Sequence, residues 1–287
     1  MNRTIDRMQH SKEFPAIFHI EPTNICNQQC SMCPRDKIKR KEGFIKLDTV
    51  EKLVTEAKKY HMHPEIELYK DGEPLLHPQL FDMIWYASGE ECITHINTNG
   101  VFLTEYVMRN LVQAGLTHLT ISVLTSDQQK NLSIKHCDNF DTLKENISKL
   151  KIIRESLNSS TPVIRIKTLS TMYTPEFDKI WGEYADMIHV SKYHNWGGLL
   201  DTMRILHNKP CAYPWNNPVV NWDGDVSICC VDFNKQGVVG NIHDKTLYSI
   251  WHDAPIDKYR KDHLSGCLFA PCITCSQYEE VDKKWVW

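Results

Sequence analysis

The sequence predicts an α/β protein in two parts: a parallel sheet or partial barrel over residues 1–200, and a small cysteine-rich domain over residues 201–287. Two observations support this prediction. Strand-like and helical segments alternate up to residue 200, an order that builds parallel sheets whose functional loops follow the strand C-termini. Beyond that point helical periodicity weakens, and six of the eleven cysteines fall between Cys211 and Cys275.

Each expected strand of the first part is short and apolar or rich in β-branched residues. The strands are expected within residues 14–21, 66–69, 92–96, 116–123, 162–169 and 189–191. Helical spacing of apolar residues predicts helices over 48–60, 78–87, 103–114, 140–157 and 175–188, with Asp48 as the N-cap of the first and Thr104 near the start of the third. In the second part we expect a hairpin with an Asp-Gly turn over 219–229 and a short helix over 246–251.

Composition limits the classes of function. The 287 residues are 41% hydrophobic and 24% charged, with a net charge of −3, which does not favour nucleic acid or an anionic membrane as a partner. No apolar run approaches the roughly 20 residues of a membrane span, and the polar N-terminus lacks a signal-peptide core. A cytoplasmic location is therefore expected, where eleven cysteines indicate metal or redox chemistry rather than disulfides.

Three thiols lie close together at Cys26, Cys30 and Cys33, and Pro34 follows at once. Thiolates at this density suit zinc or an iron–sulfur cluster. A closed site of either kind normally takes four protein ligands, so three leave one position for a substrate or cosubstrate. The same spacing could also form a buried helical stripe, but the prolines around the segment favour a loop.

Three motifs occur in a fixed order along the chain: C-x-x-x-C-x-x-C after the first expected strand, DGEP (residues 71–74) after the second, and TNG (residues 98–100) after the third. This order resembles the radical S-adenosylmethionine (SAM) superfamily. The resemblance implies a partial (β/α)6 barrel in which Cys26, Cys30 and Cys33 hold a [4Fe–4S] cluster and SAM chelates the fourth iron. Reductive cleavage of SAM would then give a 5′-deoxyadenosyl radical, which abstracts hydrogen from an unactivated C–H bond.

The same resemblance assigns a cofactor role to the DGEP turn. Gly72 and Glu73 occupy the family's GGE motif, which helps to hold the amino group of SAM. Asp71 stands where the family has its first glycine, a departure that leaves the two following residues intact.

Further SAM contacts are implied at Met32, Asn99 and Ser122. Met32 occupies a usually aromatic position beside the adenine, and its soft side chain can cover a ring. Asn99 and Ser122 lie where family members often contact the methionine or ribose, although both residue types also satisfy backbone groups at strand ends.

The C-terminal cysteines resemble the SPASM or twitch domain of the same superfamily. Cys211, Cys229, Cys272 and Cys275 would hold an auxiliary [4Fe–4S] cluster and close it to substrate. A four-cysteine zinc site remains the alternative, because zinc accepts the same ligands. Cys267 could also take the place of Cys272.

Cys230 is the candidate catalytic residue. Neighbours on a strand point to opposite faces, so if Cys229 faces the cluster, Cys230 is expected to face the barrel mouth. A thiol there could donate a hydrogen atom to a substrate radical, as in radical SAM epimerases. The alternative is a small buried packing residue.

The resemblance implies an enzyme that dehydrogenates or epimerises a small molecule or sugar. In size and cysteine layout the chain is similar to 2-deoxy-scyllo-inosamine dehydrogenases and aminoglycoside epimerases. The alternative is a peptide-modifying (RiPP-type) maturase acting on a short peptide, although Cys26 lies too near the N-terminus for a leader-binding domain before it. A non-catalytic zinc or iron–sulfur structural or electron-transfer protein is the alternative of another class. The enzyme would need an electron donor such as flavodoxin or ferredoxin.

Overall fold

The computed structural model describes residues 11–200 and 205–278. Its strands form one nine-stranded sheet in the order β6-β5-β4-β3-β2-β1-β7-β8-β9. Strands β1 to β6 are parallel to their neighbours, β1 is also parallel to β7, and β7, β8 and β9 are antiparallel. The predicted α/β fold with a parallel sheet is therefore confirmed.

The first six strands lie where the alternating pattern predicts them, within a few residues at each end. Their bounds are β1 Ile17–Ile20, β2 Glu65–Glu67, β3 Ile93–Thr98, β4 His118–Leu124, β5 Val163–Leu169 and β6 Met187–Ser191. The predicted hairpin consists of β7 Val219–Val220 and β8 Asp225–Ser227, and β9 Val238–Asn241 pairs with β8. Gly224 closes the hairpin turn with φ +87°, a conformation that favours glycine.

The helices are α2 Leu47–Ala57, α3 Leu80–Gly89, α4 Glu105–Gln113, α5 Gln128–Lys135, α6 Phe140–Ser156, α7 Pro175–Trp181, α8 Tyr213–Asn216, α9 Leu247–Trp251 and α10 Ala254–Ser265. Three short 3₁₀ turns lie at Arg35–Lys37 (η1), Pro74–Leu76 (η2) and Cys272–Thr274 (η3). Helix α4 starts near Thr104 as predicted, and Thr104 is its N-cap, since its side chain accepts from Val107 N.

Two helix predictions were wrong. The segment predicted as one helix over 175–188 ends at Trp181, because Asp186 supports β5 instead: its carboxylate accepts from Ile164 N at 2.8 Å. Lys46, not Asp48, is the N-cap of α2, and Asp48 lies in the first turn, where an acid is favourable.

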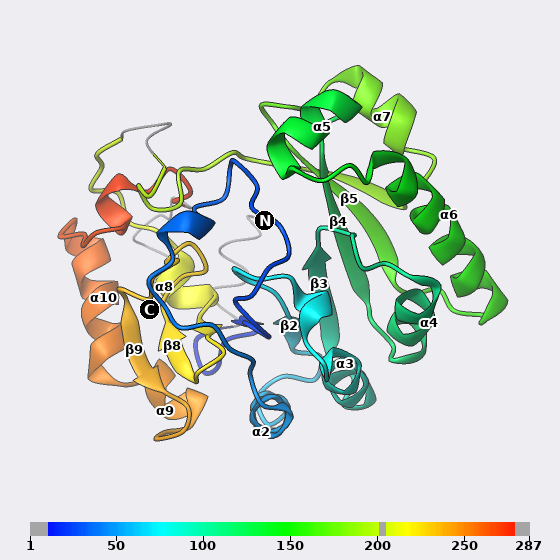
Figure 1. The fold of residues 1–287 in the computed structure, drawn as a ribbon. Helices are drawn as coiled ribbons and strands as arrows, with labels where there is room; N and C mark the ends of the chain where they lie inside the picture. Colours follow the sequence, from blue (N-terminus) through cyan, green and yellow to red (C-terminus); the bar gives the residue numbers. More distant parts are fainter. Residues whose placement is uncertain (1–10, 201–204, 279–287) are drawn as a thin grey trace.

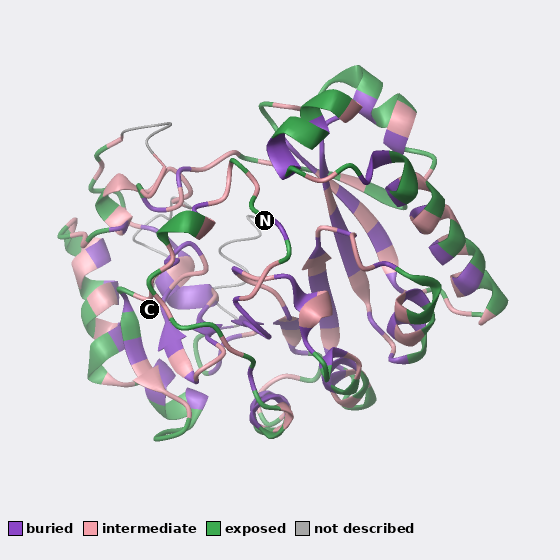
Figure 2. Ribbon diagram, in the orientation of Figure 1, coloured by how far each residue is buried: buried purple, intermediate pink, exposed green. Residues whose placement is uncertain are grey.

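The helices α2, α3, α4, α6 and α7 lie along the outer side of the curved sheet (Figure 1). Alternate residues on the strands point toward them and are completely buried, among them Ile66, Ile96, Ile164 and Ile166. Burial alternates along most of β5, where the intervening residues are partly exposed, and on β4 His118 and Ser122 are partly exposed (Figure 2). These partly exposed residues form the face of the sheet turned away from the helices.

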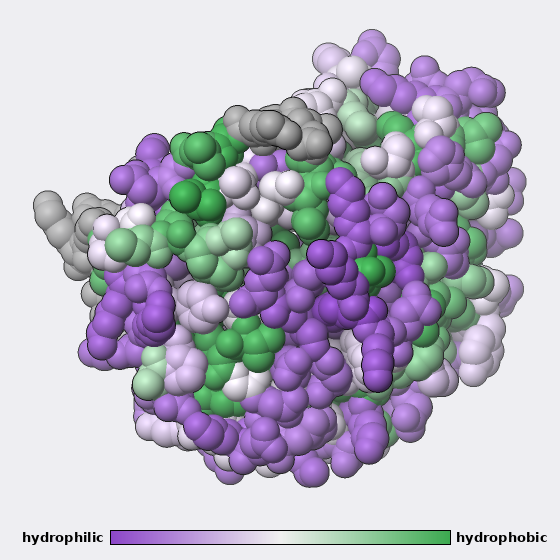
Figure 3. Space-filling model, turned by 60° about the vertical axis from the view of Figure 1, so that its left-hand side comes forward, coloured by the Kyte–Doolittle hydropathy of each residue, from purple (hydrophilic) through white to green (hydrophobic). Residues whose placement is uncertain are grey.

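The C-terminal part continues the same sheet. His19 and Ile20 of β1 pair with Val219 and Val220 of β7, so the hairpin is joined directly to the parallel strands. The molecular face in Figure 3 is largely hydrophilic, with hydrophobic residues in separate small areas. Within the described residues, no helix has both the length and the apolar character to cross a membrane.

Candidate functional site

The three thiols of the first motif lie in an irregular loop that follows β1, as predicted. Cys26, Cys30 and Cys33 are partly buried and free, and the backbone turns between the last two, where Cys33 N donates to Cys30 O at 2.9 Å. Burial raises the pKa of all three thiols, to about 12 for Cys33. The thiols are therefore protonated on their own, and they release protons when they bind a metal.

The DGEP turn leaves β2 and packs directly against this loop. A Cβ on Gly72 would lie 2.2 Å from Thr23 O, so only glycine permits the contact. The next residue closes it: Glu73 N donates to Ile25 O at 2.8 Å. The two motifs therefore meet at the C-terminal edge of the sheet.

Glu73 is buried and its carboxylate is held by three donors. Its Oε1 accepts from Thr98 Oγ1 at 2.7 Å and from Leu75 N at 3.1 Å, and its Oε2 accepts from Asn99 N at 2.8 Å. Burial nevertheless raises the pKa of Glu73, and its charge lies close enough to Cys26 to raise the pKa of that thiol as well. A cationic ligand group beside Glu73 would be stabilised.

The remaining predicted SAM contacts are Asn99, Ser122 and Met32, of which Asn99 lies directly against the cysteine loop. Asn99 Nδ2 donates to Asn27 Oδ1 of the cysteine loop at 2.8 Å. Ser122 lies farther along the sheet on β4, and its hydroxyl donates to Asn97 Oδ1 at 3.0 Å. Met32 packs against a small apolar cluster, and its backbone oxygen accepts from Trp196 Nε1 at 3.1 Å.

Lys135, at the end of α5, is a site residue that the sequence analysis missed. It is buried, and its ammonium donates to Ser122 O. Burial lowers the pKa of Lys135 to about 8, while the nearby Cys30 and Glu73 act to raise it. The structure thus brings a buried cation beside the thiols and Glu73, where it could hold the carboxylate of a ligand.

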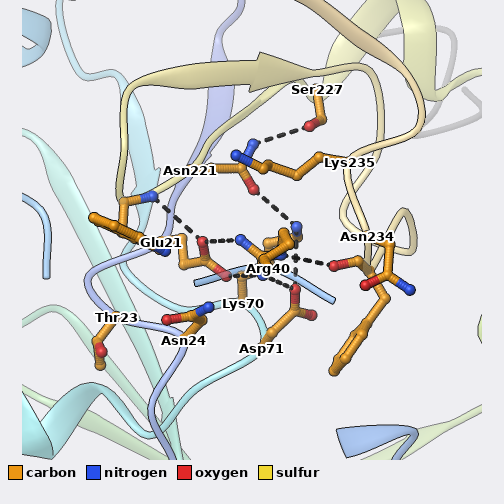
Figure 4. Close-up of polar contacts among 12 residues, drawn as sticks. Glu21, Thr23, Asn24, Arg40, Lys70, Asp71, Asn221, Ser227, Asn234 and Lys235 are labelled. Carbon is orange, nitrogen blue, oxygen red and sulfur yellow. Dashed lines mark hydrogen bonds and ion pairs between the residues drawn. The ribbon is translucent and has the colours of Figure 1, made fainter. Parts of the chain in front are cut away.

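A buried network of charges connects this edge to the C-terminal part (Figure 4). Arg40 binds both oxygens of Glu21 at 2.7 and 2.8 Å and Asp71 Oδ2 at 2.6 Å. Lys70 lies 3.1 Å from the same Asp71 oxygen and donates to Asn221 Oδ1 at 2.9 Å. Asp71, which stands in place of the first glycine of the family motif, therefore binds the side chains of Arg40 and Lys70, and both of these also contact the second part of the chain.

The four predicted auxiliary thiols also come together. Cys211, Cys229, Cys272 and Cys275 line one small cavity. Backbone N–H groups point at two of the sulfurs, from Val231 to Cys229 Sγ and from Gln277 to Cys275 Sγ, both at 3.3 Å. Hydrogen bonds of this kind support thiolates that bind iron–sulfur clusters.

The geometry expected for Cys229 and Cys230 was wrong. Strand β8 ends at Ser227, so both cysteines lie in the following turn and do not alternate along a strand. Cys229 and His19 of β1 both lie close enough to Cys230 to influence the pKa of its thiol, and Cys230 influences the pKa of Cys275 in turn. Cys230 therefore lies between the auxiliary cavity and the parallel sheet. Cys267 is exposed and is not among the residues that line that cavity.

These residues fit the cofactors that their motifs imply. The donor sets are three and four free thiols, as expected for an open and a closed iron–sulfur site. At the first site two buried polar atoms, Gln28 Nε2 and Asp71 Oδ1, have no hydrogen-bond partner in the described protein. A polar ligand could satisfy both.

Family models and related proteins agree with this geometry. The radical SAM superfamily model matches residues 20–188, and the iron–sulfur cluster-binding domain called SPASM matches residues 211–276. The chain is 25% identical to the tungsten-containing aldehyde ferredoxin oxidoreductase cofactor-modifying protein of Pyrococcus furiosus, over 92% of this chain and 88% of that one. It is also 25% identical to the S-adenosyl-L-methionine-dependent 2-deoxy-scyllo-inosamine dehydrogenase of Niallia circulans, over 86% of each.

Two solved structures share the fold. BtrN in complex with AdoMet and 2-DOIA has a TM-score of 0.66 at 21% identity, over 92% of this chain and 94% of that one. Streptococcus suis SuiB bound to precursor peptide SuiA has a TM-score of 0.71 at 14% identity, over 88% of this chain and 69% of that one. Since the superfamily model covers more than half of the sequence, the protein is an enzyme of the radical SAM superfamily that binds SAM and a [4Fe–4S] cluster, with a SPASM-type iron–sulfur domain at its C-terminal side.

Proposed function

We propose that this enzyme abstracts a hydrogen atom from an unactivated C–H bond of a small polar molecule or sugar, and so dehydrogenates or epimerises it. The observation that supports this most is the meeting of the three-thiol loop, Glu73 and Lys135 at one edge of the parallel sheet. When bound, the reduced cluster and SAM supply a 5′-deoxyadenosyl radical, with methionine as the other product.

In this proposal the chain's own residues bind and orient the cofactors. Cys26, Cys30 and Cys33 ligate the first cluster, and Glu73 accepts hydrogen bonds from the amino group of SAM while Gly72 allows the close contact beneath it. Lys135 holds the carboxylate of SAM, because its buried ammonium has no carboxylate within hydrogen-bonding distance in the described structure. The residues with backbone or side-chain contacts to the rest of SAM are Met32, Asn99 and Ser122.

The second cluster belongs to the C-terminal domain, which we place over residues 201–287 after a first domain of residues 1–200. Cys211, Cys229, Cys272 and Cys275 would be its ligands. Four thiolates leave this cluster closed to substrate, so its role would be electron transfer. A flavodoxin or ferredoxin would supply the electrons.

Cys230 is our candidate for the residue that decides the outcome. The mutual influence of His19 and Cys230 on their pKa values supports a position of this thiol beside the parallel sheet. In an epimerisation the S–H bond would break and its hydrogen would form a new C–H bond on the substrate radical. The sulfur radical left behind needs one electron and one proton to become a thiol again.

The first experiment is anaerobic reconstitution followed by dithionite and SAM, with 5′-deoxyadenosine and methionine measured by chromatography. Wild type should form both in equal amounts, and failure to form either would refute the proposal. Glu73→Gln should keep its iron yet form 5′-deoxyadenosine about 10–100 times more slowly, the usual effect of losing a supporting contact at a metal site.

Cys230→Ala separates the two outcomes once a substrate is in hand. If Cys230 donates hydrogen, wild-type product formed in deuterated water should carry deuterium at carbon, and the variant should not make it. A variant that epimerises normally would exclude the donor role. Loss of about four of the roughly eight iron atoms from the variant would instead identify Cys230 as a ligand.

A further inference from the structure

The face of the sheet turned away from the helices, here called the inner face, carries polar side chains on successive strands. His19, Glu67, His95 and His118 pair in register across β1 to β4. Strand β5 is the next strand after β4, and it carries Arg165 and Lys167. Both are partly exposed and alternate with the buried residues Ile164, Ile166 and Thr168. The inner face therefore suits a polar ligand rather than an apolar one.

The negative charge of Glu67 on this face is already compensated. His19 Nε2 lies 2.6 Å from one oxygen of Glu67, and His95 Nδ1 lies 3.8 Å from the other. Burial alone would lower the pKa of His19, but Glu67 raises it well above its ordinary value. Glu67 and His19 thus form an internal ion pair.

The positive charges on β5 are not compensated in this way. Within residues 11–200 and 205–278, the side chains of Arg165 and Lys167 make no hydrogen bond and no ion pair, and Arg165 Nε is buried. Cys230 and Glu67 act on Lys167 only from a distance, and a buried or half-buried cation without a directly bound counter-charge is costly. A bound anion would therefore stabilise both side chains.

The positive charges of Arg165 and Lys167 also affect the pKa values of two neighbouring histidines, His118 and His189. Burial and then Arg165 lower the pKa of His118 to about 4, and burial followed by Lys167 and Arg165 lowers the pKa of His189. Both imidazoles are therefore neutral at pH 7. They add hydrogen-bonding groups to the region, and His118 Nδ1 is buried there without a partner in the described structure.

We propose that Arg165 and Lys167 bind an anionic group, a carboxylate or a phosphate, of the molecule on which the enzyme acts. The guanidinium can make two parallel hydrogen bonds to either group, and the ammonium adds a second charge. Lys167 also lies near Cys230, so a ligand anchored there would extend beside the thiol. This inference rests on the proposed function, since it names the class of substrate for the same site.

The test uses the reconstituted holoenzyme saturated with SAM, and the probes are inorganic phosphate and malonate. Binding is measured by titration calorimetry in wild type, Lys167→Met, Arg165→Gln and Lys167→Arg. The matched control is Lys179→Met, an exposed lysine of α7, which lies on the outer side of the sheet (Figure 1). Circular dichroism and iron content verify that each variant is folded and loaded.

We expect wild type and Lys179→Met to bind at least one of the two anions equally well. Lys167→Met and Arg165→Gln should bind it at least tenfold more weakly, and Lys167→Arg should retain most of the affinity because its charge remains. Tighter binding of phosphate would identify a phosphorylated substrate, and tighter binding of malonate a carboxylic acid.

Two results would overturn the inference. One is an anion affinity that does not change in Lys167→Met and Arg165→Gln, or that is absent in wild type. The other is a loss of SAM affinity in these variants, which would mean that the cations serve the cofactor. Calorimetry does not depend on catalysis, so a failure of wild type to cleave SAM refutes the proposed function separately.

Discussion

Replacing Arg40 with methionine should destabilise the protein by about 3–5 kcal/mol, the cost of removing one partner from a buried ion pair. Arg40 makes two hydrogen bonds to Glu21 and one to Asp71, whose carboxylates are 0% exposed (Figure 4). Without Arg40, Asp71 still has Lys70 at 3.1 Å, but Glu21 keeps only the more distant charge of Lys70 and a weak bond from Trp222 N at 3.3 Å. The loss would be a large share of the 5–15 kcal/mol typical of a folded protein.

Urea unfolding of the reconstituted protein measures this cost, and a double-mutant cycle tests its cause. In a Glu21→Gln background the same Arg40→Met change should cost at least about 1 kcal/mol less, because the Glu21 carboxylate that would be left unpaired is no longer present. Lys52→Met provides the control: its pair with Asp48 is exposed at 3.7 Å and should contribute less than about 0.5 kcal/mol. An Arg40→Met effect as small as this control, or a cycle that is additive, would refute the reasoning.

Three further predictions concern close packing, protonation and metal content. Gly72→Ala should lower stability by about 1–3 kcal/mol through overpacking and reduce cluster retention, whereas Gly89→Ala, with nothing within 4 Å of its Cβ, should be neutral or stabilising in urea unfolding. Burial lowers the pKa of His118 to about 4, so below the ordinary histidine pKa of 6.5 the folded state binds fewer protons than the unfolded chain. As the pH is lowered from 7 to 5, wild type should therefore lose stability relative to His118→Gln. Stability curves of the two proteins that stay parallel over this pH range would contradict the prediction. Cys272→Ala should lose about half of the iron measured by inductively coupled plasma spectrometry, and Cys267→Ser should lose none. The reverse result would show that Cys267, not Cys272, is the cluster ligand.

Local pattern was enough to predict the strands of the parallel sheet and the hairpin around Gly224. The preferences of β-branched runs and of turn residues depend on only a few neighbouring residues. They therefore hold in any fold that buries one face of the sheet. Helix ends were less predictable. Residues 182–186 continue an apolar pattern, yet Asp186 is drawn away by contacts with Ile164 N and Arg154 that no local rule contains.

The motif residues could be predicted because each lies directly after a strand, and parallel strands deliver such residues to one edge. Lys135 and Arg40 could not be predicted in this way. Arg40 meets Phe233 across 193 positions of sequence, and Lys135 is the last residue of a helix, α5, that was not expected. Both matter through burial and long-range pairing, which appear only once the chain is folded.

The pairing of β1 with β7 makes the N-terminal strand an interior member of the sheet. Its backbone donors and acceptors on that side, near His19 and Ile20, can be satisfied only by residues about two hundred positions later. During synthesis the first strand would leave the ribosome with an unprotected edge, the kind of surface on which chains aggregate. Closing the sheet is therefore a late, non-local step, and the thiol loop that follows β1 acquires its final surroundings only when most of the polypeptide has been made.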